Sequence, residues 1–277
     1  MKIQLSLFIK EALLFGSTLA LGIFVAYRYV ASFSASLITQ APVFSFEDLG
    51  IVIVVIVLMW LANRVPRVAH AIFWVFLTLI VLSGSQAVIG SFAPYPWDVV
   101  GSFAVLLIFF LLQNVLVHDI AMVVAIAGIA AVVGITITPS VGVVALVVLS
   151  FYDIIAVYKT KHMVRMAEGM IRSGAVFGFI IPNTFKKFFA SRREARARVG
   201  TDFMMLGSGD IGLPAIFVAS LVRQSLPEAC IVAVFVMLGL FATHLLFVGQ
   251  TNRKPMAALP PIATMTMLGY VVALLII

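Results

Sequence analysis

Nine apolar segments follow one another along this chain, with mostly short polar connections between them. A membrane-spanning helix needs about 20 mostly apolar residues. We therefore expect an all-α, polytopic membrane protein of about nine helices, built as a single membrane-embedded domain over residues 1–277. The segments lie near 11–33, 48–63, 68–92, 97–116, 119–137, 140–158, 203–222, 227–249 and 256–277. Helices one to six thus occupy 11–158, a cytoplasmic loop 159–202, and helices seven to nine 203–277.

The composition excludes a soluble protein. Only 10% of the residues are charged, whereas a soluble domain carries about 25%. The net charge of +7 resides in short loops, so we interpret it as a topology signal and not as a nucleic-acid surface. The first apolar stretch, 12–27, is at or beyond the upper length of a signal-peptide core, and we interpret it as a retained helix.

The basic residues favour one orientation. Cytoplasmic loops of membrane proteins collect Lys and Arg. With the N-terminus in the cytoplasm and the C-terminus outside, all but Arg28 and Arg223 of the 18 Lys and Arg residues fall on the cytoplasmic side. The 159–202 loop is part of that side. Within it, Lys186–Arg198 is basic and prone to helix, whereas Gly174–Ile181 is apolar but too short to span.

Two acidic residues lie within the predicted spans. Asp153 precedes Lys159 by six residues, and Asp210 follows Asp202 by eight. At 1.5 Å per helical residue both acids come to a similar depth, toward the cytoplasmic side. An ionisable residue within a span costs about 2.5–3.5 kcal/mol and is by default a functional candidate. A structural acid pair or a proton relay would fit the same two residues.

Two carboxyl groups held close together share one proton more readily than both ionise. The ionised group can then activate water while the protonated group polarises a carbonyl, which is the chemistry of peptide hydrolysis. The segment Ala257-Ala258-Leu259-Pro260-Pro261 lies at the same membrane side. Its two prolines predict a helix start with irregular backbone, which is tolerated at membrane depth where it lines a cavity.

Three short motifs resemble the presenilin and signal peptide peptidase family of intramembrane aspartyl proteases. They are Tyr152-Asp153 on helix six, Gly207-Ser208-Gly209-Asp210 on helix seven, and Ala258-Leu259-Pro260 on helix nine. Their order and spacing match the family over nearly the whole chain, and the compact chain looks like an archaeal presenilin homologue. The sequence differs at Ala257, where the family's motif has proline, and at Ser208, where presenilin usually has leucine.

The resemblance implies that Asp153 and Asp210 are the catalytic pair, with no metal or other cofactor. Tyr152, Gly207, Ser208, Gly209, Ala258, Leu259 and Pro260 would then shape the site and bind substrate. The implied partners are transmembrane-helix substrates and the lipid bilayer, with a homo-oligomer as a further possibility and no nucleic acid. The implied location is the plasma membrane of a prokaryote, as a multi-pass protein.

Other functions remain open at this point. An ion channel or proton-coupled transporter also uses paired membrane acids, and prepilin-peptidase-like enzymes share the Gly-x-Gly-Asp motif. The four histidines lack the spacing of a zinc protease, and the sequence lacks the Gly-x-Ser-x-Gly motif of many serine hydrolases. We expect His118 and Asp119 to be solvated residues of a cytoplasmic turn.

Overall fold

The computed structural model describes residues 5–32, 66–250 and 255–277. In this part of the chain, six helices are long and apolar enough to cross a membrane, and two apolar helices are shorter. The long ones are α1 (Leu5–Ser32), α4 (Pro66–Gly90), α6 (Val115–Thr136), α7 (Pro139–Ile154) with its continuation η1 (Ile155–Lys159), α11 (Leu226–Val248) and α12 (Leu259–Ile276). The shorter ones are α5 (Trp97–Leu111) and α10 (Ser208–Leu221).

These helices make a polytopic membrane protein, as the apolar segments predict. The predicted segment at 48–63 lies outside the described residues, so the number nine and the orientation of the termini stay predictions. The end of α7 departs from the α-helix, because Ile155–Lys159 forms a π-helix. Each hydrogen bond of a π-helix encloses one residue more than a hydrogen bond of an α-helix.

The connection 159–202 is folded into helices and a strand. It holds α8 (His162–Ser173), strand β1 (Gly178–Pro182), the 3₁₀ helix η2 (Phe185–Phe189) and α9 (Arg192–Ala197), and strand β2 (Phe203–Gly207) follows it. β1 and β2 pair antiparallel, with Ile180 opposite Met205. The expectation that helix seven starts at 203 was therefore wrong. Residues 203–207 are extended because their backbone bonds to β1, and α10 begins only at Ser208.

Helix α6 is at the centre of the bundle and packs against α1, α4 and α10. Its contact with α4 is backbone to backbone. A Cβ atom added to Gly84 would collide with the backbone of Ala125, and one added to Gly128 would collide with the carbonyl of Gly84. Small residues permit such close approach between membrane helices. This contact fixes the position of α6, whose first turn lies beside β1.

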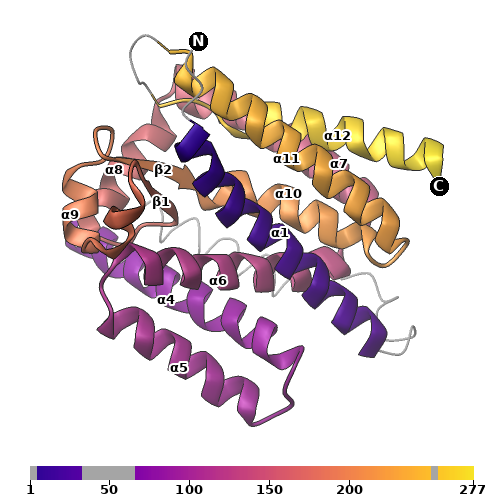
Figure 1. Ribbon diagram of the computed structural model, residues 1–277, viewed down its shortest axis with the longest axis horizontal. Coiled ribbons are helices and arrows are strands. Elements are labelled where there is room, and N and C mark those ends of the chain that lie inside the picture. Colours follow the sequence, from indigo (N-terminus) through magenta and orange to yellow (C-terminus); the bar gives the residue numbers. More distant parts are fainter. Residues whose placement is uncertain (1–4, 33–65, 251–254) are drawn as a thin grey trace.

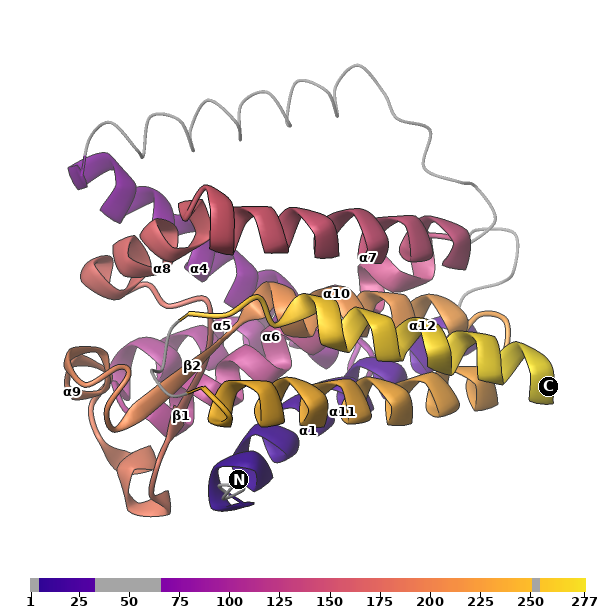
Figure 2. The ribbon, with the colours of Figure 1, turned by 90° about the horizontal axis from the view of Figure 1, so that it is seen from above.

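The two strands, α8 and α9 gather at one end of the bundle, and the C-terminus lies at the opposite end (Figure 1). The view from above shows the same arrangement, with the beginnings of α1 and α12 toward the strands (Figure 2). Helices α7, α10, α11 and α12 form a group in which α10 and α12 each pack against the other three. The candidate residues of the sequence motifs belong to the strand end of this group.

Candidate active site

Asp153 lies in the last turn of α7. This helix starts at Pro139, whose missing N–H is no loss at the first turn of a helix, and runs through mostly apolar residues to Ile154. The Asp153 side chain is buried, with 5% of the residue exposed. The neighbouring Tyr152 is 52% exposed and lies on the outward face. The structure thus places the acid of this motif inside the protein and its tyrosine outside.

Asp210 lies in the first turn of α10. Gly207 is the N-cap of this helix, with extended backbone angles, and joins it directly to β2. A Cβ atom on Gly207 would lie 3.2 Å from Oδ2 of Asp210, whereas one on Gly209 would meet nothing within 4 Å. Gly207 therefore leaves room for the carboxyl group, and Gly209 leaves open space beside it. The positive end of the helix dipole also favours a carboxylate at this position.

The structure brings the two acids together. Helices α7 and α10 pack against each other, and the carboxyl groups of Asp153 and Asp210 are close enough to repel one another when both are ionised. Two carboxyl groups in that relation favour the state in which one keeps its proton. The matched depths that the sequence predicts therefore have a structural counterpart. The chain reaches Asp210 differently from the prediction, because residues 203–207 form strand β2 and not the first turns of a helix.

The start of α12 completes the group. The backbone N–H of Leu259 donates to Oδ2 of Asp153 across 3.4 Å. The chain before it, 255–258, is irregular, and the Ala258 carbonyl accepts a hydrogen bond from Thr243 Oγ1 on α11. Ala258 and Leu259 are buried, and Pro260 is partly exposed. All three sequence motifs therefore meet at the end of the bundle that carries the strands.

The β1–β2 hairpin leads into Asp210. The apolar segment Gly174–Ile181, which is too short to span, contributes β1, and β2 ends three residues before Asp210. Gly178 has a positive φ of 137°, and a Cβ atom there would collide with the Leu206 carbonyl. A glycine is thus required where β1 approaches the end of β2. Because β2 continues directly into α10, the position of the hairpin determines where α10 starts.

The expectation that His118 and Asp119 are solvated was wrong. Both lie in the first turns of α6 and are buried, with 1% and 0% of the residue exposed. They hydrogen-bond to the backbone of β1. The interpretation failed because it placed the turn in water, whereas the loop folds back over it. Two polar residues at the start of an apolar segment were the signal that could have identified them.

Sequence reasoning also missed a buried pair between α1 and α11. Glu11 Oε2 lies 2.9 Å from His244 Nδ1, and both side chains are almost fully buried. Lys10, next to Glu11, is buried as well and bonds to the chain at the end of β1. Glu11 and Lys10 stand near the start of the first apolar segment, where they read as ordinary flanking charges.

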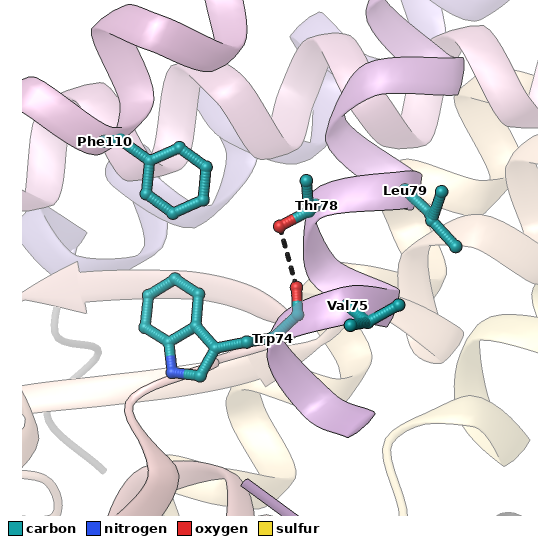
Figure 3. A pocket seen from close by; sticks show the side chains of 5 residues that line it. All are labelled: Trp74, Val75, Thr78, Leu79 and Phe110. Atoms are coloured by element: carbon teal, nitrogen blue, oxygen red, sulfur yellow. Dashed lines mark hydrogen bonds between the residues drawn. The ribbon is translucent and has the colours of Figure 1, made fainter. Parts of the chain in front are cut away.

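An apolar groove between α4 and α5 lies apart from these residues. Figure 3 shows Trp74, Val75, Thr78, Leu79 and Phe110 around it. The Trp74 and Phe110 rings stack at 5.9 Å, and the Thr78 hydroxyl bonds back to the Trp74 carbonyl. No lining side chain is ionisable, so the groove has no chemistry of its own. Among the described residues, no three His, Cys, Asp or Glu side chains are grouped as a metal site.

Comparison with known proteins connects this geometry to a family. The family described as "Signal-peptide peptidase, presenilin aspartyl protease" matches residues 47–277. One structure of a presenilin family intramembrane aspartate protease, in space group P2, is similar at 25% identity and a TM-score of 0.62, with 96% of each chain covered. Another, in space group C222, is similar in fold at 24% identity and a TM-score of 0.58, with 95% of each chain covered. Comparison with curated proteins gave no match. The chain belongs to the signal-peptide peptidase and presenilin family and is an intramembrane aspartic endopeptidase.

Proposed function

We propose that Asp153 and Asp210 are the catalytic pair of this endopeptidase and that they hydrolyse peptide bonds within transmembrane segments of other proteins. The observation that carries the proposal is the meeting of three motifs at one place. The carboxyl groups of Asp153 and Asp210 are close enough to interact electrostatically, and the Asp153 carboxyl group also accepts from the first amide of α12. An acid pair with a purely structural role would not need the irregular segment beside it.

In the proposed mechanism, one carboxyl is ionised and the other is protonated. The ionised carboxylate takes a proton from water as the water oxygen bonds to the scissile carbonyl carbon, and the protonated carboxyl donates to the carbonyl oxygen. The resulting gem-diol then collapses: one of its hydroxyl groups returns a proton to the second carboxylate as the C–N bond breaks, and the leaving nitrogen receives a proton from the first carboxyl. Every proton stays within the pair, the water and the substrate, so no cofactor takes part.

The substrate must unwind before this reaction, because the peptide groups of a membrane helix are hydrogen-bonded within it. We propose that the unwound strand adds to the outer edge of β2. Backbone bonds at both ends of the hairpin, from Ser208 to Phe177 and from Asn183 to Asp202, fix which residues face inward. By alternation Met205 faces outward. In this register its N–H and C=O point away from β1, and no other described segment of the chain gives them a backbone bond.

The irregular segment before α12 forms the opposite wall of this proposed substrate site. Ala257, Ala258 and Leu259 are buried, and the Leu259 N–H bonds to Asp153, so this segment would limit the space beside the acid. Tyr152 lies outside this wall, so of the two residues in its motif only Asp153 has a role in the proposed site. Ser208 and Gly209 open the site from the other side, where Gly209 presents a bare backbone.

The topology belongs to the same proposal. We propose one membrane-embedded domain of nine helices, with the N-terminus and 159–202 in the cytoplasm and the C-terminus outside, in the plasma membrane of a prokaryote. Helices α8 and α9, whose sequences contain basic residues, lie at the strand end of the bundle, opposite the C-terminus (Figure 1). That is the end at which the candidate acids lie, so the site would open toward the cytoplasm.

The decisive experiment reconstitutes the protein into liposomes with a single-span reporter. The wild type is expected to cleave the reporter, and Asp153→Ala and Asp210→Ala are each expected to abolish cleavage while the proteins remain folded. Proton and cation flux are measured in the same liposomes. Flux that depends on both aspartates, without cleavage, would instead establish a channel or transporter.

A further inference from the structure

The outer edge of β1 is occupied by three buried side chains. His118 Nε2 donates to the Gly178 carbonyl across 3.0 Å, and Asp119 Oδ1 accepts from the Ile180 N–H across 2.8 Å. Lys10 Nζ donates to the Pro182 carbonyl across 2.9 Å and to the Asn183 carbonyl across 2.7 Å. The three side chains come from two helices, α1 and α6.

These contacts follow the register of a β-strand. In an antiparallel hairpin every second residue directs its N–H and C=O away from the partner strand. Gly178, Ile180 and Pro182 are those residues in β1, since Phe177 and Asn183 bond inward. The capping side chains therefore meet the strand where a neighbouring strand would, donating to a carbonyl and accepting from an amide. Pro182 has no N–H that would need a partner.

Placing these side chains in the protein interior carries a free-energy penalty. Lys10, His118 and Asp119 are each at most 1% exposed, and a buried polar group without a hydrogen bond costs roughly 1–3 kcal/mol in proteins. Among the described residues, the second polar atoms of His118 and Asp119, Nδ1 and Oδ2, are buried without a partner. The hydrogen bonds to β1 therefore offset part of the cost of burying these two side chains.

We propose that Lys10, His118 and Asp119 act as an edge cap, which closes β1 to strand addition and directs an unwound substrate to β2. This proposal rests on the proposed function. Adjacent strands lie about 4.8 Å apart. A substrate on β2 would be the immediate neighbour of the strand that leads to Asp210, whereas a substrate on β1 would lie two strand spacings from β2, on the opposite side of the hairpin. Addition at β1 would therefore bind substrate out of reach of the acids.

The kinetic signature of the cap is specific. A substrate bound at an open β1 edge is held without being cleaved. Such non-productive binding lowers kcat and KM by the same factor and leaves kcat/KM unchanged, because kcat/KM reports the transition state relative to free enzyme and free substrate. Damage to the site itself lowers kcat/KM. The two outcomes are therefore distinguishable in one experiment, with wild-type cleavage as the reference.

The test compares matched variants on a single-span reporter in liposomes. Asp119→Leu and His118→Leu remove the bonds to β1, whereas Asp119→Asn keeps an acceptor and His118→Gln keeps a donor. The leucine variants are expected to show kcat and KM lowered together by roughly tenfold, the equivalent of about one hydrogen bond. The asparagine and glutamine variants are expected to approach the wild type. A fall in kcat/KM that is equal in the leucine and the amide variants would overturn the cap.

A second measurement covers the case in which a leucine variant does not fold. Amide hydrogen exchange is followed in Asp210→Asn protein, with and without the uncleaved reporter. The Ile180 amide is expected to be protected in both states, because Asp119 holds it, and the Met205 amide is expected to become protected only with reporter. Protection that appears at Ile180 on reporter binding, with Met205 unchanged, contradicts the proposal. The proposed function is tested separately by wild-type cleavage.

Discussion

The backbone N–H of Leu259 bonds to the carboxyl group of Asp153, and this bond joins the start of α12 to the end of α7. The first turn of a helix has N–H groups without partners inside the helix. In α12 the next two residues are Pro260 and Pro261, which have no N–H at all. Leu259 is therefore the one donor among the first three residues of α12, and Asp153 accepts from it. A change at this segment is expected to act on the acid directly.

We expect Asp153→Asn and Asp210→Asn each to reduce cleavage by at least about 10²-fold, because a general acid–base pair contributes that much or more and loses its function with either member. Both variants should remain folded, since an amide of the same shape removes a carboxyl repulsion. Reporter cleavage and the thermal unfolding midpoint in detergent are the measurements. Near-normal cleavage by either variant would end the assignment.

The orientation can be checked with single cysteines in a Cys230→Ser background. A cysteine near Glu47, which lies outside the described residues, is expected to react with a membrane-impermeant reagent in intact cells. A cysteine at Arg196, on α9, should react only after lysis, because the basic residues place this loop in the cytoplasm. The reverse labelling pattern would invert the proposed topology.

We predict that Gly207→Ala lowers kcat about tenfold with little change in KM. A methyl group there would lie 3.2 Å from Oδ2 of Asp210 and shift the carboxyl group by a few tenths of an ångström. Gly209→Ala is the matched control for folding, since its methyl group would meet nothing within 4 Å. Its effect should appear in KM, because the methyl group occupies space proposed for substrate. Equal kinetic effects of the two alanines would argue against this geometry.

Changes at the start of α12 should discriminate between substrates. Pro260→Ala and bulky replacements of Leu259 are expected to impair cleavage of a helical reporter more than cleavage of one unwound in advance by helix-breaking residues. The physical reason is that the segment is proposed to hold the substrate in its unwound form. A helical reporter has to unwind before it is cleaved, whereas the other reporter is already unwound. Equal loss on both reporters, together with normal substrate binding, would exclude the holding role.

The Glu11–His244 pair gives a prediction for stability alone. Breaking a buried pair by removing one member typically costs about 3–5 kcal/mol, whereas replacing both members by apolar residues can be neutral. Glu11→Leu is therefore expected to lower the thermal unfolding midpoint more than the double variant Glu11→Leu/His244→Leu. Unfolding in detergent measures both. A double variant less stable than either single variant would show that the pair itself is favourable in this position.

The apolar segments and the motif residues were predictable from the sequence, because membrane helices need long apolar runs and charged residues are rare within them. The spans at α1, α4, α6, α7, α11 and α12 follow from that pattern, and so does the proximity of Asp153 and Asp210. The start of α10 was not predictable in this way. Phe203–Leu206 is apolar and continues the pattern of a span, and only its pairing with β1, a contact between distant parts of the chain, makes it a strand.

The buried residues around β1 could not be predicted for the same reason. His118, Asp119 and Lys10 stand at the ends of apolar segments, where polar residues ordinarily face water. Whether they are solvated depends on how residues 174–183 fold back over them. These contacts join distant parts of the chain, so the local sequence pattern does not predict them. The Gly174–Ile181 segment was identifiable as unusual by its length, yet its pairing with β2 is a contact between distant parts of the chain.

The π-helix that ends α7 has a consequence for comparing sequences. Ile155–Lys159, which begins two residues after Asp153, accommodates one residue beyond an α-helical turn. A relative that is one residue shorter here can form an ordinary α-helical end with its aspartate unmoved. A one-residue gap at this place in an alignment would then record a change of helix type, while the site beside it stays intact.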